Sequence, residues 1–270
     1  MLKTEMRNPH TAHIDSMTTK QMLRVMQDEN QNAINSVGNV LNEIEKAVDG
    51  IYAGMKDGGR LFYVGCGTSG RIGVADAAEC PPTYGVSPDL IIGIIAGGDR
   101  ALRTAVEGFE DSFESGYREM QAYGLSDKDS VVGLSAAGGA AFVLGALSSA
   151  RESGAFLIGI TSNADSSLAE AADVAICPDT GAEVVTGSTR MKAGTAQKVI
   201  LNMISTSVMI KSGYVYENYM INLKPSNIKL RNRMIYITSE IAQISREEAE
   251  RLLEENDFGI RSAVQSACKA

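Results

Sequence analysis

The residues best suited to chemistry lie in the stretch 61–71, which reads LFYVGCGTSGR. An apolar run leads into the pattern G-x-G-x-x-G, which is typical of a turn between a strand and a helix. The unpaired backbone N–H groups at the start of such a helix, together with the positive end of its dipole, can hold an anion. Thr68 and Ser69 add two hydroxyl donors that a turn made only for tight packing does not need. We therefore predict a phosphate-binding turn made of Gly67, Thr68, Ser69 and Gly70.

Two other interpretations of this turn stay open. The glycines can serve close packing alone, or they can form a dinucleotide site, which usually has an acidic residue about 20 positions on, at the end of the next strand. Here the next predicted strand runs into the sequence AGGD at 96–99, further along than that pattern requires. The segment CPPTYG at 80–85 also predicts a break in the intervening helix, because proline lacks the N–H that a helix interior needs. A phosphomonoester is therefore favoured over a nicotinamide cofactor.

A second candidate anion site precedes a long predicted helix, at residues 184–192, VVTGSTRMK. Its hydroxyls and backbone N–H groups would lie at the helix start, where Arg190 and Lys192 add positive charge. An ordinary Ser/Thr helix cap is the alternative. Glu183, just before this stretch, would bind sugar hydroxyls or pair with Arg190. The predicted substrate-binding residues here are Glu183, Ser188, Thr189 and Lys192.

Five short apolar runs must position these residues. They are rich in Val and Ile and continuous rather than alternating, which is typical of strands buried on both faces. The intervals between them are long enough for crossover helices, so the sequence predicts an α/β fold with a five-stranded parallel sheet and helices on both faces. The predicted strands are residues 61–65, 90–96, 130–135, 155–161 and 173–177.

Helical patterns flank the predicted sheet on both sides. Before it, two helices are expected at 18–28 and 30–56. After it, a long helix over 188–213 ends at a glycine, a natural C-terminal cap, and an amphipathic helix with a capping-box start is expected at 245–255. We divide the chain into an N-terminal helical arm, an α/β domain and a C-terminal helical segment, at 1–57, 58–215 and 216–270.

Composition and charge exclude several classes of protein. The formal net charge is −8 and no run of Lys or Arg offsets it, so no nucleic-acid partner is expected. No segment has the roughly 18 consecutive apolar residues of a membrane helix, and the N-terminus lacks the apolar core of a signal peptide. The four cysteines are far apart, which predicts reduced thiols in a cytoplasmic protein. His10 and His13 are the only histidines and have no cysteine beside them, so we predict no metal site.

Three longer blocks carry a resemblance to a known family. They are GCGTSGRIGVADAAECPPTYGVSP, IAGGDRALRTAVEGFED and GAEVVTGSTRMKAGTAQKVILNMISTSVMIKSG, at 65–88, 95–111 and 181–213. Together they resemble the N-acetylmuramic acid 6-phosphate etherases, which are sugar-isomerase-domain proteins related to the glucokinase regulatory proteins. The resemblance runs from TEMRNPHT near the start to the C-terminal helices, and the chain is shorter at its C-terminus than a typical member.

The resemblance implies an activity and two catalytic residues. Members of the family are lyases that convert N-acetylmuramic acid 6-phosphate and water into N-acetylglucosamine 6-phosphate and D-lactate, in the recycling of cell-wall amino sugars and without a cofactor. By motif, the two catalytic glutamates of the family correspond to Glu79 in AAECPP and Glu110 in GFED. We expect Glu79, at a helix–turn junction, to be the general acid. We expect Glu110, on a helix with Glu107 one turn before it, to be the base.

One loop departs from the family pattern. After the third strand, the etherases usually have an SGRTP-like loop whose hydroxyls and Arg help to hold the substrate, whereas this chain reads SAAGGAAF over 135–142. Ser135 is the remaining side-chain donor of that loop. This loss favours an alternative function, a sugar-phosphate-binding regulatory protein without catalysis. The positions that correspond to the Ser, Arg, Thr and Pro of the family are Ala137, Gly139, Ala140 and Ala141.

The resemblance also implies a homodimer whose active site is completed across the two subunits. Apolar residues in the N-terminal helices would form that contact, unless they are buried within one subunit. The candidate contact residues are Met22, Leu23, Val25 and Met26.

Overall fold

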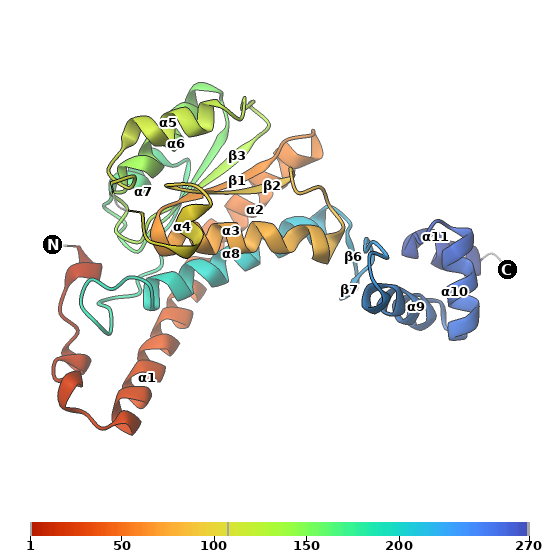
Figure 1. Ribbon diagram of the computed structural model, residues 1–270, viewed down its shortest axis with the longest axis horizontal. Helices are drawn as coiled ribbons and strands as arrows, with labels where there is room; N and C mark the ends of the chain where they lie inside the picture. Colours follow the sequence, from red (N-terminus) through yellow and green to blue (C-terminus); the bar gives the residue numbers. More distant parts are fainter. Residues whose placement is uncertain (1, 107, 269–270) are drawn as a thin grey trace.

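The computed structural model describes residues 2–106 and 108–268. Its centre is a five-stranded parallel sheet in the order β2-β1-β3-β4-β5, shown in Figure 1. Every strand lies within a predicted apolar run, so the predicted parallel sheet is confirmed. The strands are β1 (Leu61–Gly65), β2 (Ile91–Ile95), β3 (Ser130–Leu134), β4 (Phe156–Ile160) and β5 (Val174–Ile176).

Helices cover both faces of the sheet, because successive side chains of each buried strand point to opposite sides. Tyr63 of β1 packs into one core, whereas its neighbours Phe62 and Val64 pack into the other. The core around Tyr63 is covered by α2 (Leu41–Lys56), α3 (Gly67–Tyr84) and α8 (Lys192–Lys211). The opposite core is covered by α5 (Phe113–Gln121), α6 (Ala141–Glu152) and α7 (Ser167–Ala171).

The N-terminal arm contains one long helix where the sequence predicted an early break. After three short 3-10 turns, at Lys3–Glu5, Pro9–Thr11 and Ile14–Ser16, α1 runs over Thr19–Gly38. Figure 1 shows this helix extending away from the sheet. The predicted boundary between residues 28 and 30 is wrong, because nothing there stops a helix. The turn comes instead at residues 39–40, just before α2.

The expected helix break at CPPTYG is also wrong. Helix α3 continues through Pro81 and Pro82 to Tyr84 and ends at Gly85, whose φ is +65°. The two prolines stand in the last turns, where each removes one hydrogen bond to a carbonyl four residues earlier. The N–H of Gly85 donates to the carbonyl oxygen of Pro81 at 2.9 Å and closes the helix end.

The C-terminal helices form a separate cluster with a hydrophobic core of their own, which includes Met234, Ala249 and Leu253. A short hairpin of β6 (Val215–Tyr216) and β7 (Tyr219–Met220) leads to them, and Figure 1 shows them apart from the sheet. The predicted helix at 245–255 is confirmed as α10. The three helices are α9 (Ile228–Ala242), α10 (Arg246–Glu255) and α11 (Ile260–Ala267).

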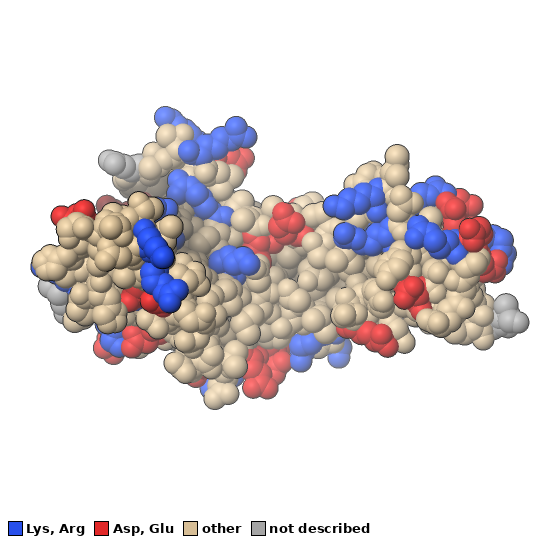
Figure 2. All heavy atoms as spheres, turned by 90° about the horizontal axis from the view of Figure 1, so that it is seen from below, with Lys and Arg blue, Asp and Glu red and all other residues tan. Residues whose placement is uncertain are grey.

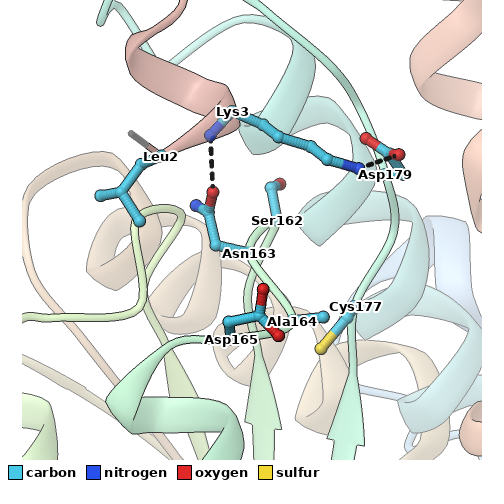
Figure 3. A pocket seen from close by; sticks show the side chains of 8 residues that line it. All are labelled: Leu2, Lys3, Ser162, Asn163, Ala164, Asp165, Cys177 and Asp179. Atoms are coloured by element: carbon cyan, nitrogen blue, oxygen red, sulfur yellow. Dashed lines mark hydrogen bonds and ion pairs between the residues drawn. The ribbon is translucent and has the colours of Figure 1, made fainter.

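The first residues of the chain are tied to the ends of β4 and β5, as Figure 3 shows. The backbone N–H of Lys3 donates to Oδ1 of Asn163 at 3.0 Å, and its Nζ pairs with Asp179 at 2.5 Å. These contacts border a cavity of about 490 Å³, which also includes Ser162 and Cys177. This cavity contains none of the predicted site residues.

The order of the strands determines where a ligand site is expected. From β1 the chain crosses to β2 on one side, and it returns to place β3 on the other side of β1. In open α/β sheets, ligands bind at such a switch point, outside the carboxyl ends of the strands. The loop after β1 is the glycine-rich turn, and the loop after β3 is the segment at 135–140.

Candidate functional site

The glycine-rich turn joins β1 to α3 at this switch point. A Cβ on Gly70 would lie 2.6 Å from the carbonyl oxygen of Gly65, so strand and helix approach too closely for any side chain there. Gly67 is the first residue of α3 and has a φ of +50°. The backbone N–H groups of Gly67 and Thr68 have no partner within the helix. The geometry suits an anion, and binding itself stays a prediction.

A cavity of about 450 Å³ opens beside the turn. Cys66 and Gly67 contribute to its wall from the turn, and Arg71 lies one helical turn further, on the same face of α3. Glu110 and Asp111 line it from the segment that follows α4 (Arg100–Arg103). The structure therefore brings the predicted anion-binding turn and one predicted catalytic glutamate into one cavity. Sequence reasoning did not identify Arg71 or Asp111, although the i, i+4 spacing from Gly67 was a signal for Arg71.

Glu110 was expected on a helix, but it lies in an exposed turn. The glycine at 108, with a φ of +84°, precedes it in an irregular segment. The carbonyl oxygen of Glu110 accepts a hydrogen bond from the backbone N–H of Phe142 at 3.0 Å, which fixes the turn against the start of α6. Glu107, which was expected one helical turn before it, lies outside the described residues.

The thiol of Cys66 faces this acidic part of the cavity. Burial, and secondarily the carboxylates of Glu110 and Asp111, raise the pKa of Cys66 to about 12. The thiol is therefore protonated at neutral pH, and it has none of the thiolate character of a nucleophile.

Ser69 does not face the cavity in the way that its place in the turn suggested. It is buried, and its hydroxyl donates to Oε1 of Gln197 on α8 at 2.9 Å. Thr68 is partly exposed, and its methyl group lies close to Gly194 at the start of α8. Of the two predicted hydroxyl donors, Thr68 is the more accessible, and its binding to a ligand stays a prediction.

Glu79 lies about two turns beyond Arg71 along α3, on a different face of the helix. Its exposed side chain lines a second cavity, of about 340 Å³, between α3 and α8. Asp76 at the wall of this cavity is buried and accepts hydrogen bonds from Asn202 at 2.5 Å and Ser205 at 3.2 Å. Within one chain, Glu79 and Glu110 therefore line different cavities.

In the second candidate anion site, Glu183 and Lys192 are bound to other groups of the chain. Glu183 is fully buried, and its carboxylate accepts hydrogen bonds from the backbone N–H groups of Lys192 and Ala193, both at 3.0 Å. Glu183 therefore caps the first turn of α8, which begins at Lys192 and not at 188. Its carboxylate bonds to this backbone and, among the described residues, forms no ion pair with Arg190. Sugar binding by Glu183 stays a prediction. Ser188 and Thr189 remain partly exposed.

The ammonium group of Lys192 is paired with other groups of the chain. It is buried in an ion pair with Glu29 of α1 and donates to the carbonyl oxygen of Ala182 at 2.8 Å. Nδ1 of His10 lies 2.8 Å from the other oxygen of Glu29. Burial opposes the charged form of Glu29, but the hydrogen bonds from Lys192 and His10 outweigh it and lower the pKa of this carboxyl.

The loop after β3 is held by contacts that do not involve a ligand. The hydroxyl of Ser135 accepts a hydrogen bond from the backbone N–H of Gly138 at 3.0 Å. Nδ2 of Asn163 donates to the carbonyl oxygen of Ala136 at 3.0 Å. The hydroxyl oxygen of Ser135 thus accepts a hydrogen bond within the loop itself, and α6 starts after Ala140 without a side-chain cap.

Within residues 2–106 and 108–268, no group of three or more His, Cys, Asp or Glu side chains has the arrangement of a metal site. None of the helices described there is long and apolar enough to cross a membrane.

Comparison with known protein families places the chain among sugar-isomerase-domain proteins. The family described as the glucokinase regulatory protein N-terminal SIS domain matches residues 43–151, and the SIS domain family matches residues 110–207. The chain is similar in fold to a phosphoheptose isomerase from Francisella tularensis, with a TM-score of 0.57 and 19% identity over 72% of this chain and 100% of that one. The fold is also similar to that of a phosphosugar isomerase from Bacteroides fragilis, with a TM-score of 0.54 and 23% identity over 76% of this chain and 98% of that one.

Curated relatives match nearly the whole chain. An N-acetylmuramic acid 6-phosphate etherase from Caldanaerobacter subterraneus subsp. tengcongensis is 48% identical over 97% of this chain and 86% of its own length. The protein of the same name from Salmonella agona is 45% identical over 98% of this chain and 90% of its own length. These names support the etherase interpretation of the sequence, not the regulatory alternative.

Proposed function

We propose, because this chain belongs to the N-acetylmuramic acid 6-phosphate etherase family, that it is a lyase that cleaves the D-lactyl ether of N-acetylmuramic acid 6-phosphate. The products are N-acetylglucosamine 6-phosphate and D-lactate. The observation that carries the proposal is the shared cavity at the switch point, which brings Glu110 beside the glycine-rich turn.

The chemistry requires an acid and a base but no cofactor. An ether is inert to simple hydrolysis at neutral pH, so the sugar ring must first open to the free aldehyde. The aldehyde acidifies the adjacent C–H, and the lactyl ether lies one carbon further along. A base removes that proton, an acid protonates the departing ether oxygen, and D-lactate leaves. Water then adds to the unsaturated aldehyde to give the second product.

Glu110 is the proposed base and Glu79 the proposed acid. Glu110 suits the first role because it lines the cavity beside the turn that would hold the phosphate. Glu79 suits the second because it projects from the same helix that begins at the turn. Within one chain the two carboxyls line different cavities, so we propose that the second subunit of a homodimer brings them together.

The surface around α3 and α8 supports this assembly. A shallow hollow on α8 is lined by Val199, Met203 and Thr206 and continues into the cavity with Glu79 through Lys198 and Asn202. Figure 2 shows the molecule from below the view of Figure 1: uncharged side chains cover much of the centre, and Lys and Arg lie together with Asp and Glu over the C-terminal helices. A second copy that covers this surface would bury apolar area and enclose Glu79.

The deciding experiment measures D-lactate. We expect the purified protein to release stoichiometric D-lactate and N-acetylglucosamine 6-phosphate from N-acetylmuramic acid 6-phosphate. Glu79→Ala and Glu110→Ala are each expected to abolish release while leaving the thermal unfolding midpoint unchanged, because both side chains are exposed. If the intact protein releases no lactate at millimolar substrate, the proposal is wrong.

The proposed setting is the cytoplasm. Four free cysteines, two of them in or next to the candidate cavities, suit a reducing compartment.

A further inference from the structure

The acid–base steps proposed above do not use Arg71, but its position suits it to bind a ligand. It lies on α3 four residues beyond Gly67, on the same helix face, and lines the same cavity as Glu110. Its Nε donates to the carbonyl oxygen of Leu102 at 3.1 Å, which holds the guanidinium against the segment after β2. Among the described residues, this is the one hydrogen bond that the side chain makes. The terminal nitrogens, which match the geometry of carboxylate and phosphate oxygens, are left for a ligand.

The charge of the cavity favours a role for this cation with an anionic ligand. Glu110 and Asp111 both line the cavity and repel an anion, whereas Arg71 is the single cation among the described residues that line it. Lys192, the other basic residue predicted for the site, is neutralised by Glu29 in a buried pair. The loop after β3 has no cationic side chain either. A phosphosugar that enters beside Glu110 therefore meets one cationic side chain among the described residues of the cavity wall, next to the N–H groups of the turn.

We propose that Arg71 is a ligand-binding residue that pairs with an anionic oxygen group of the substrate. This inference rests on the proposed function, since the substrate named there has two such groups, the phosphate and the lactyl carboxylate. Either group would form the same charge-assisted hydrogen bonds with the guanidinium. The experiment below separates the two sources.

The test uses two variants that differ in one contact. In Arg71→Gln, Nε2 stands at the same distance along the side chain as Nε of arginine, so the bond to Leu102 can persist while the charge is removed. Arg71→Met removes both. The matched control is Arg103→Gln, which removes an exposed cation from the neighbouring helix α4, outside the lining of the cavity. All are made in the Glu110→Gln background, which prevents turnover.

Calorimetric titration then compares three compounds. They are N-acetylmuramic acid 6-phosphate, N-acetylglucosamine 6-phosphate and N-acetylmuramic acid. We expect Arg71→Gln to weaken binding about 10- to 100-fold for the compounds that carry the paired group, as for the loss of one charge-assisted contact. A loss confined to the two phosphorylated compounds assigns Arg71 to the phosphate. A loss confined to the two lactyl compounds assigns it to the carboxylate.

Two results of the titration would contradict the role proposed for Arg71. If Arg71→Gln binds all three compounds as the control does, the inference is wrong. It is also wrong if binding falls only in Arg71→Met and together with its unfolding midpoint, because the side chain would then serve only the contact with Leu102. Failure of the proposed function looks different: the unmodified protein would bind the phosphosugars through Arg71 and release no lactate.

Discussion

The hydroxyl of Ser69 donates a hydrogen bond to Oε1 of Gln197 at 2.9 Å and so joins the first turn of α3 to α8. Both side chains are buried, and Nε2 of Gln197 has no partner among the described residues. The contact lies directly behind the glycine-rich turn. Ser69 therefore stabilises the turn from the protein side, whereas Thr68 is more exposed.

Ser69→Ala is expected to reduce stability more than ligand affinity. The change leaves Oε1 of Gln197 buried without a donor, which costs about 1–3 kcal/mol in the free energy of unfolding. Urea denaturation measures this loss, and titration with N-acetylglucosamine 6-phosphate is expected to show a change in affinity of less than about threefold. Thr68→Ala is expected to show the reverse pattern. Equal losses of affinity in the two variants would contradict the roles assigned here.

Mixing two inactive variants tests whether the active site is shared between subunits. If Glu79 of one subunit acts with Glu110 of the other, a heterodimer of Glu79→Ala and Glu110→Ala contains one intact site. Equal amounts, unfolded and refolded together, would then recover about 25% of the wild-type lactate release. The matched control mixes Glu79→Ala with the double variant and stays inactive. No recovery in the first mixture, despite a dimeric mass by light scattering, would place both glutamates in one subunit's site.

Lys192→Met is expected to destabilise the protein strongly. It leaves the carboxylate of Glu29 buried without its cation, and the removal of one partner of a buried pair typically costs about 3–5 kcal/mol. Denaturant titration measures the loss. Lys46→Met on α2 is the control, and because this lysine is exposed, we expect a change within about 0.5 kcal/mol. A similar small effect for both variants would show that the pair adds nothing to stability.

The same pair predicts how stability depends on pH. The pKa of Glu29 is lower in the folded chain than its ordinary value of 4.5. The folded protein therefore binds fewer protons than the unfolded chain between these two values, and the stabilisation is present above the ordinary value and lost as the pH falls through the folded pKa. The difference in unfolding free energy between wild type and Glu29→Gln is thus expected to shrink from pH 7 to pH 3. A constant difference would contradict the lowered pKa.

Gly139→Arg is expected to strengthen binding of phosphosugars. A Cβ at this position meets no atom within 4 Å, so a long side chain fits without displacing its neighbours. The added cation at the start of α6 would lower the KM for N-acetylmuramic acid 6-phosphate about 10-fold. Gly138→Ala is the contrasting variant, since its Cβ would lie 2.2 Å from Oγ of Ser166 and its φ is +79°. An unchanged KM in Gly139→Arg would show that the ligand lies away from this loop.

The sheet could be predicted because its strands are buried on both faces, and each therefore appears in the sequence as a continuous apolar run. The ends of the helices were harder to predict from the sequence. Helix α1 projects from the sheet, so its exposed surface leaves little periodic pattern to mark where it ends. The prolines of α3 stand where few hydrogen bonds are lost, and sequence alone did not show that Tyr84 still belongs to the helix.

Only those features of the candidate site that depend on neighbouring residues in the sequence could be predicted. The glycine-rich turn was recognised from its own spacing, but the placement of Glu183 and Lys192 depends on partners far away in the sequence. Glu183 caps a helix that starts nine residues later, at Lys192, and that lysine is held by Glu29 of α1. Arg71 was overlooked because its importance arises from the two acidic residues across the cavity, which only the fold places there.

The loop after β3 owes its shape to Ser135 and to Asn163, a residue on a different loop. Gly139, by contrast, is exposed, and a Cβ there would meet no atom within 4 Å, so a substitution at this position leaves the scaffold intact. Such a position can change over evolutionary time, or be changed by an engineer, and alter which sugars are accepted while the rest of the protein goes on folding as before.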